Sequence, residues 1–203
     1  MSQRGPFTRS FFARDALEVA PELLNALLER GGCLARIVEV EAYRGGDDPA
    51  SHAYRGKTAR NATMFGEPGH LYVYFTYGMH FCANVVCGPK GEASAVLLRA
   101  LSPVKGMQTM RRRRHGMERD RDLCSGPAKL CEAFGITRSL DGADLLYGKE
   151  GIVLRRDGVA PPREPNIGLR VGLSERSGAA RTFPWRFAVP GDPNVSRAMR
   201  IPT

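Results

Sequence analysis

The sequence predicts an α+β fold: one compact domain with a mainly antiparallel, curved sheet, flanking helices and a protruding β-hairpin. Its 203 residues are 42% hydrophobic, which is enough for a single core and leaves little room for a second domain. Several short segments alternate apolar and polar residues, which is typical of strands that bury one face. Other segments carry apolar residues at helical spacing, bounded by glycine or proline. This mixture of elements indicates the α+β class.

A helix and a strand are expected first. Residues 16–30 carry leucines on one stripe, with a proline near the start and Gly31–Gly32 at the end, which predicts a helix. Residues 33–43 alternate and predict a strand. Because side chains two apart on a strand share a face, Glu41 and Tyr43 are expected to project together.

A long connection and three strands follow. Residues 44–70 form a connection whose histidines, aromatic residues and methionine favour a functional loop over disorder. Segments 71–76 and 80–87 predict two strands of a hairpin that turns at Tyr77–Gly78. Residues 94–101 predict a third strand.

The second half is expected to hold two helices and short strands. One helix starts at Ser102–Pro103 and stops near Gly116, and another opens at Ser125-Gly-Pro127 and ends at Gly135. The expected short strands lie at residues 152–154, 169–173 and 185–189. The folded domain is expected to span residues 9–190, between an exposed N-terminal arm, 1–8, and a C-terminal tail, 191–203.

The charge of the chain indicates a polyanionic partner. Thirty Lys and Arg residues face 21 Asp and Glu, so the formal net charge is +9. Nucleic acid is the favoured partner, and a membrane surface or an acidic protein are alternatives. Every basic side chain of Lys or Arg type after Lys149 is arginine, which suits bidentate binding of phosphates but also fits a GC-rich genome. No apolar run is long enough to cross a bilayer.

The five cysteines, without a CxxC pair, favour a reducing cytoplasm. The odd number and the absence of a recognisable secretory signal support this interpretation. Their spacing does not resemble that of a structural metal site, so no metal is expected.

Four segments together resemble the alkyladenine (3-methyladenine) DNA glycosylase family. They are Val40-Glu-Ala-Tyr43, Asp47-Asp-Pro-Ala-Ser-His52, Leu71-Tyr-Val-Tyr-Phe-Thr-Tyr-Gly-Met79 and Leu97-Leu-Arg-Ala100. Leu123-Cys-Ser-Gly-Pro127 fits as well, and the resemblance runs from about Arg9 to about Val189. The specificity lies in the ordered set, because no single tetrapeptide is diagnostic.

The resemblance implies that Glu41 is the catalytic residue. Cleavage of an N-glycosidic bond builds positive charge on the sugar, and a carboxylate stabilises that charge and deprotonates an attacking water. Without the resemblance, a solvated carboxylate on a strand face is the simpler interpretation of Glu41.

The resemblance also implies an aromatic pocket for a flipped base. Tyr43 and His52 are expected on one side of the base and Tyr74 on the other, with Asn84 screening out purines that carry a 2-amino group. Aromatic faces favour cationic alkylated purines. The alternatives are ordinary core packing for Tyr74 and a backbone-bonded loop histidine for His52.

Contacts to double-stranded DNA are implied through the minor groove. Tyr77 at the hairpin tip is expected to fill the gap left by the flipped nucleotide, with Met79 as an apolar flank. The phosphate-binding candidates are Arg99, Arg170, Arg181 and Arg186. A structural salt bridge is the alternative for Arg99. Arg111–Arg114 is interpreted as an accessory phosphate contact or as a solvated helix end.

The expected activity is base-excision repair of alkylated or deaminated purines by a monofunctional, monomeric glycosylase. Because the pocket segments contain no lysine, water rather than an amine is the expected nucleophile. No cofactor and no membrane association are implied, and the expected location is the cytoplasm, at the nucleoid. A non-catalytic nucleic-acid-binding module is the main alternative, and a formyltransferase-like enzyme is a second. The preferred lesion stays open among 3-methyladenine, 7-methylguanine, hypoxanthine and ethenoadenine.

Overall fold

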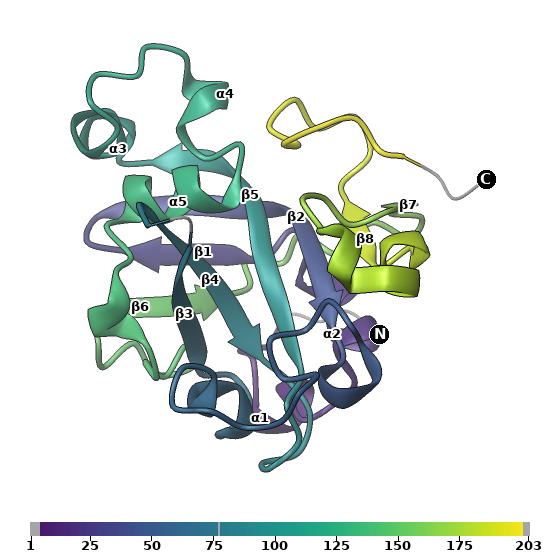
Figure 1. The fold of residues 1–203 in the computed structure, drawn as a ribbon. Coiled ribbons are helices and arrows are strands. Elements are labelled where there is room, and N and C mark those ends of the chain that lie inside the picture. The colour runs from purple at the N-terminus through teal and green to yellow at the C-terminus, as the bar shows by residue number, and fades with distance from the viewer. Residues whose placement is uncertain (1–4, 77, 201–203) are drawn as a thin grey trace.

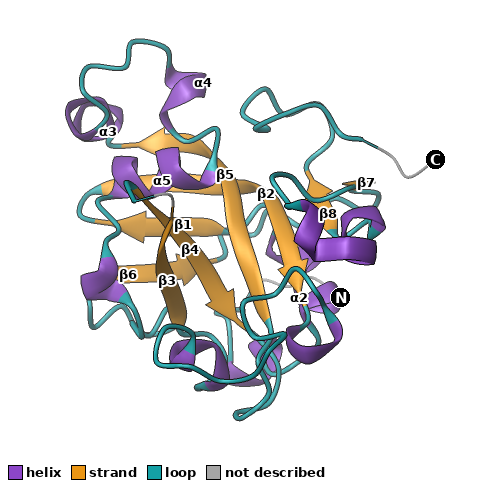
Figure 2. Ribbon diagram, viewed as in Figure 1, coloured by secondary structure: helices purple, strands orange, loops and turns teal. Residues whose placement is uncertain are grey.

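The residues described by the computed structural model, 5–76 and 78–200, form an antiparallel sheet of eight strands (Figures 1 and 2). The main path runs β3–β4–β5–β2–β1–β6, and β8 joins it through β2 while β7 pairs with β8. The α+β class predicted from the sequence is thereby confirmed. The strands are β1 (Leu27–Arg30), β2 (Cys33–Tyr43), β3 (Leu71–Thr76), β4 (His80–Val86), β5 (Ala95–Lys105), β6 (Ile152–Arg155), β7 (Asn166–Gly168) and β8 (Arg186–Ala188).

Short helices surround the strands. They are α1 (Arg9–Phe12), α2 (Ala16–Leu23), α3 (Met107–Arg113), α4 (Asp120–Leu123) and α5 (Pro127–Phe134), with 3₁₀ helices at Gly45–Asp47, Ala62–Phe65, Arg138–Leu140 and Glu175–Thr182. The Asp15 side chain caps α2 by accepting the Leu17 N–H at 2.8 Å. Within the described part of the chain, no helix has the length and apolar character needed to span a membrane.

Strand β2 lies inside the sheet and has partner strands along both of its edges. Its first half pairs with β1, its Glu39–Glu41 stretch pairs with β8 on that same edge, and β5 runs along its other edge. The β2–β5 register shifts on both sides of Glu39. Such irregularities re-aim side chains and are frequent beside active sites.

The main core lies between the sheet and helices α2 and α5. Val19 and Leu23 of α2 and Leu130 and Phe134 of α5 are fully buried. Residues 37–42 of β2 are buried on both strand faces. Polar side chains in that stretch therefore need partners from the protein itself.

The helix predicted over residues 16–30 is wrong beyond Leu23. Asn25 has a left-handed backbone (φ 66°), and the next residues form β1 instead. Gly31 and Gly32, both with positive φ, make the two-residue turn that joins β1 to β2. The leucines that suggested a helical stripe also suit a buried strand.

Two further expectations need correction. Strand β5 continues to Lys105, so no helix starts at Ser102; Gly106 (φ 84°) makes the turn and α3 follows it. The strand expected at residues 169–173 lies instead at β7, and residues 171–174 approach the pocket described below. The other expected strands and the helix ending at Gly135 agree with the structure.

Both terminal segments pack more closely than the expected arm and tail. Phe7 is buried against Phe11 and Phe12, with the Arg156 guanidinium 4.1 Å from its ring centroid. At the other end Asn194 is buried and donates to the Ser102 hydroxyl at 3.0 Å. Phe7 and Asn194 are thus buried in contact with the rest of the protein, while Gly5, Pro6 and Thr8 are exposed.

Candidate active site

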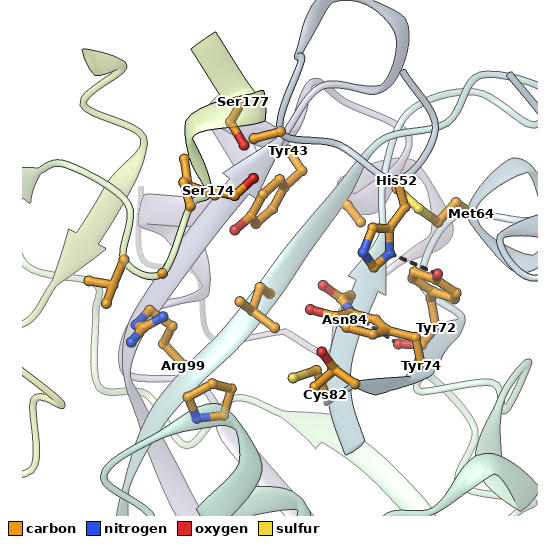
Figure 3. A pocket seen from close by; sticks show the side chains of 18 residues that line it. Tyr43, His52, Met64, Tyr72, Tyr74, Cys82, Asn84, Arg99, Ser174 and Ser177 are labelled. Carbon is orange, nitrogen blue, oxygen red and sulfur yellow. Dashed lines mark hydrogen bonds between the residues drawn. The ribbon is translucent and has the colours of Figure 1, made fainter. Parts of the chain in front are cut away.

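A pocket of about 480 Å³ opens beside the ends of β2, β3, β4 and β5 (Figure 3). The strands supply Tyr43, Tyr74, Asn84 and Arg99. The remaining lining comes from the loop after β2, which carries His52 and Met64, from Pro127 at the start of α5 and from the 171–177 segment. The pocket thus collects side chains from segments that are far apart in the sequence.

The register of the sheet explains this convergence. Glu41 pairs with Leu97 across β2 and β5, Leu97 pairs with Asn84 on β4, and Asn84 pairs with Tyr72 on β3. A single row of residues therefore crosses four strands. Alternation then brings the residues two positions away to the same faces, which places Tyr43 beside Glu41.

Glu41 is a fully buried carboxylate held by groups that line the pocket. It accepts the Tyr43 hydroxyl at 2.9 Å and the Val171 N–H at 2.7 Å. The Arg99 Nη1 lies 3.3 Å from its Oε1. A solvated strand-face carboxylate is therefore ruled out, while the shared face expected for Glu41 and Tyr43 is confirmed.

The surroundings of Glu41 raise the pKa of its carboxyl group. Burial is the largest cause, and Arg99, the Val171 N–H and the Tyr43 hydroxyl oppose it. For Arg99, burial lowers the pKa of the guanidinium, but the carboxylates of Glu41 and Glu39 outweigh burial and the net shift is upward. The pair thus places a base of raised proton affinity beside a cation.

His52, Tyr72 and Tyr74 form one aromatic wall of the pocket. The His52 and Tyr74 ring centroids are 4.4 Å apart in an edge-on arrangement, and the His52 Nδ1 lies 3.1 Å from the Tyr72 hydroxyl. No base fits between rings at that distance. His52 therefore belongs with Tyr74 and not, as predicted, on the Tyr43 side; Figure 3 shows Tyr43 across the pocket from both.

Burial lowers the pKa of His52, and the Arg60 charge lowers it further. Its imidazole is therefore neutral at pH 7. The loop that carries it is fixed by Asn61, whose amide donates to the His52 carbonyl at 2.8 Å and to the Gly56 carbonyl at 3.0 Å. His52 is thus a positioned, uncharged member of the aromatic wall.

The structure adds pocket residues that sequence reasoning did not single out. Tyr72 and Cys82 could have been found from alternation, because they stand two residues from Tyr74 and Asn84 on the same strands. No local pattern marks Val171, which reaches Glu41 from 130 residues away. Asn84 itself is buried and donates to the Tyr72 carbonyl at 3.1 Å.

The hairpin of β3 and β4 exposes apolar side chains near its turn. Met79 is 68% exposed, and Gly78 (φ 66°) supplies the backbone conformation of the turn. The proposed wedge Tyr77 lies outside the described residues.

The four arginines expected at phosphates occupy different environments. Arg170 is fully buried, pairs with Asp48 through both of its terminal nitrogens and stacks against the rings of Tyr43 and Trp185. Arg186 is also buried, with its Nε 2.7 Å from the Glu39 carboxylate. Neither guanidinium faces solvent, so their expected phosphate contacts are corrected to internal ones.

Arg181 is exposed and Arg99 lines the pocket, so these two keep access to a ligand. In the Arg111–Arg114 run, Arg111 pairs with Asp120 and Arg114 with Glu132.

The side chains in and beside the pocket that could ligate a metal are Glu41, His52 and Cys82. The Glu41 carboxylate accepts hydrogen bonds from Tyr43 and Val171, and the His52 Nδ1 lies within hydrogen-bond distance of the Tyr72 hydroxyl. Among residues 5–76 and 78–200, no group of three or more His, Cys, Asp and Glu is arranged to hold a metal ion.

Comparison with known proteins places the chain in a family. The methylpurine-DNA glycosylase family model matches residues 10–193. A Burkholderia orbicola protein is 55% identical over 195 residues, covering 94% of this chain and 90% of its own length. Relatives from Streptomyces avermitilis and Rhodopseudomonas palustris (strain HaA2) are 50% and 49% identical, covering 95% and 94% of this chain and 92% and 90% of theirs. All three are provisionally named 3-methyladenine DNA glycosylase.

The match identifies the chain as a DNA glycosylase, a hydrolase of N-glycosyl bonds that acts on alkylated purines in base-excision repair. Its substrate is accordingly DNA. The chain belongs to the methylpurine-DNA glycosylase family.

Proposed function

We propose that the chain flips purines of the 3-methyladenine class out of duplex DNA and hydrolyses their N-glycosidic bond, with Glu41 as the catalytic base. The observation that carries the proposal is the fully buried Glu41 carboxylate, which is held at the pocket by Tyr43, Val171 and Arg99. The names of its relatives support the substrate class.

In the proposed reaction, the bond between the purine nitrogen and the sugar C1′ breaks as positive charge builds on the sugar. Glu41 stabilises that charge and takes a proton from a water molecule. The water oxygen bonds to C1′, the electron pair of the broken bond leaves with the base, and an abasic site remains.

The pocket suits a cationic purine. Tyr43 faces one side of the base and the aromatic wall faces the other, so the ring faces attract positive charge. His52 is neutral and adds no repulsion. The Glu41 carboxylate complements the positive charge of the purine. Asn84 is the proposed screen against a 2-amino group, since its buried amide stands on the same row as Glu41.

Contact with DNA is proposed through the minor groove, with Tyr77 and Met79 as the wedge and Arg181 on the backbone. The proposed active form is a monomer. The five cysteines are free thiols, which supports work in a reducing cytoplasm on nucleoid DNA.

The test is base release from duplex DNA that carries 3-methyladenine. We expect release of the free base and an unbroken strand that alkali then cleaves at the abasic site. EDTA should leave the rate unchanged, because the proposed reaction uses no metal ion. Borohydride should trap no enzyme–DNA adduct, because the proposed nucleophile is water and not an amine. Binding without base release would favour the non-catalytic module, and a trapped adduct would show an amine nucleophile.

A further inference from the structure

A second buried carboxylate, Glu39, lies two residues before Glu41 on β2. Glu39, Glu41, Arg99 and Arg186 form an ionic cluster of two carboxylates and two guanidinium groups, whose charges balance. Arg99 bridges the carboxylates: its Nε donates to the Glu39 Oε1 at 2.8 Å, while its Nη1 lies 3.3 Å from Glu41. Glu39 therefore contacts the cation that faces the catalytic base.

The C-terminal segment supplies another partner of Arg99. The Ser196 hydroxyl oxygen lies 3.3 Å from the Arg99 Nε and 3.1 Å from its Nη2. That hydroxyl also donates to the Glu39 Oε1 at 3.0 Å, and the Ser196 N–H donates to the other Glu39 oxygen at 2.6 Å. One serine thus touches both Arg99 and the carboxylate that holds it.

Arg186 fixes the same segment from β8. Its Nε donates to Glu39, and its two terminal nitrogens donate to the carbonyls of Arg197 and Ala198 at 2.6 and 3.3 Å. Arg186 thereby helps to neutralise Glu39. Glu39 accepts hydrogen bonds from Arg186 and from Ser196 and therefore does not depend on Arg99 alone for a partner. The positive charge of Arg99 thus remains available to Glu41.

We propose that Glu39, Arg186 and Ser196 form a bracket that holds the Arg99 guanidinium against the Glu41 carboxylate, with Ser196 as the contribution of the C-terminal segment. This inference rests on the proposed role of Glu41. Ser196 is a positioning residue in it, because it acts through Arg99.

Arg99 is the cation that opposes burial at Glu41. The other titratable groups that face Glu41 are Glu39 and Tyr43 from β2, Tyr74 from β3 and Cys82 from β4. Burial raises the pKa of Tyr43, Tyr74 and Cys82 above their ordinary values, so these groups stay neutral around pH 7. Loosening Arg99 is therefore expected to raise the pKa of Glu41.

The test compares wild type with Ser196→Ala in single-turnover base release from 3-methyladenine DNA, at saturating enzyme, between about pH 5 and 9. A fixed cationic lesion needs no acid to leave, so the acid limb reports groups that must be unprotonated. We expect that limb to move up by about half to one pH unit in the variant, which lowers the rate about three- to tenfold on the acid side. The rates should converge at high pH.

Ser102→Ala is the matched control. It removes the hydroxyl that anchors Asn194 of the same segment but does not touch Arg99. Its acid limb should match that of wild type. Ser196 contacts Arg99 and Glu39 and not His52, so Ser196→Ala leaves His52 in place and the difference between the two profiles reports Glu41.

The bracket is overturned by an unchanged acid limb in Ser196→Ala, by a downward shift of that limb, or by an equal shift in Ser102→Ala. A loss of rate that is uniform with pH also contradicts it, since it indicates a structural role. Glu41→Gln, assayed in parallel, separates the hypotheses. If that variant retains activity, the role of Glu41 fails; if it is inactive while Ser196→Ala behaves as wild type, the bracket alone fails.

Discussion

The pocket has an aromatic wall of neutral rings on the β3 side and an ionic cluster on the β2–β5 side. His52 and Tyr74 meet by ring contact, and one hydrogen bond ties His52 to Tyr72. In the ionic cluster, by contrast, Glu39 and Glu41 are fully buried and Arg99 nearly so. One half of the pocket thus offers ring surfaces to a base, whereas the other holds buried charges.

The difference predicts two kinds of response to substitution. A stacking side chain contributes about 1–3 kcal/mol to binding a base, and its loss leaves the neighbouring rings in place. Removal of one partner of a buried ion pair costs about 3–5 kcal/mol, because the other charge is left uncompensated. Changes in the aromatic wall should therefore weaken binding, while changes among buried charges should abolish chemistry or stability.

Glu41→Gln should have the largest effect. The amide keeps the shape of the side chain but neither stabilises a sugar cation nor accepts a proton from water. Single-turnover base release should fall by at least about a thousandfold, since positioned base catalysis and electrostatic stabilisation are lost together.

Gel-shift binding of lesion DNA is the control, and it should survive in Glu41→Gln because the aromatic wall and Tyr43 are intact. Base release within a few-fold of wild type would remove Glu41 from the mechanism. A joint collapse of binding, melting temperature and activity would make Glu41 structural.

The aromatic wall could be predicted from sequence better than the ionic cluster, because its residues stand in short ordered segments. Strand β2 is predicted at its observed bounds, 33–43, from alternation. The β3 and β4 hairpin also follows from a local pattern. By contrast, Glu39 meets Arg186 and Ser196 across 147 and 157 residues, and no local pattern encodes those contacts.

The errors share a physical cause. Arginines late in the chain suggested a phosphate-binding surface, but composition does not tell an exposed guanidinium from one enclosed by Asp48 and two rings. Likewise, the leucines of residues 23–28 fit both a helical stripe and a buried strand. Asn25 and the Gly31–Gly32 turn decide between these structures, and tertiary pairing with β2 fixes the result.

Arg170→Ala tests the buried charges outside the ionic cluster. Asp48 would be left buried without its bidentate partner, and Tyr43 and Trp185 would lose the guanidinium between them. The free energy of unfolding, measured with urea, should fall by about 3–5 kcal/mol. Arg181→Ala is the exposed comparison, and its stability should change by less than about 0.5 kcal/mol. Equal effects in the two variants would contradict the distinction.

Tyr74→Ala tests the aromatic wall. Loss of one stacking face should weaken lesion-DNA binding by about 1–3 kcal/mol, which is roughly five- to 150-fold. Tyr74→Phe keeps the ring and should bind within a few-fold of wild type. If the phenylalanine variant loses as much affinity as the alanine variant, the hydroxyl rather than the ring face carries the interaction.

Arg181→Ala should have the smallest effect. Arg181 is exposed on the Glu175–Thr182 3₁₀ helix, which also contributes Ser177 to the pocket, so it is placed to meet backbone phosphate beside a flipped base. Loss of one phosphate contact should weaken binding to all duplexes alike and reduce the slope of log affinity against log salt by about one. Arg155→Ala is the control, because Arg155 lies on β6, does not line the pocket and pairs with Glu29. We expect its salt slope to equal that of wild type, since a residue that does not contact the DNA releases no counterions from it. An unchanged slope in Arg181→Ala, or the same reduction in both variants, would show that Arg181 makes no phosphate contact of its own.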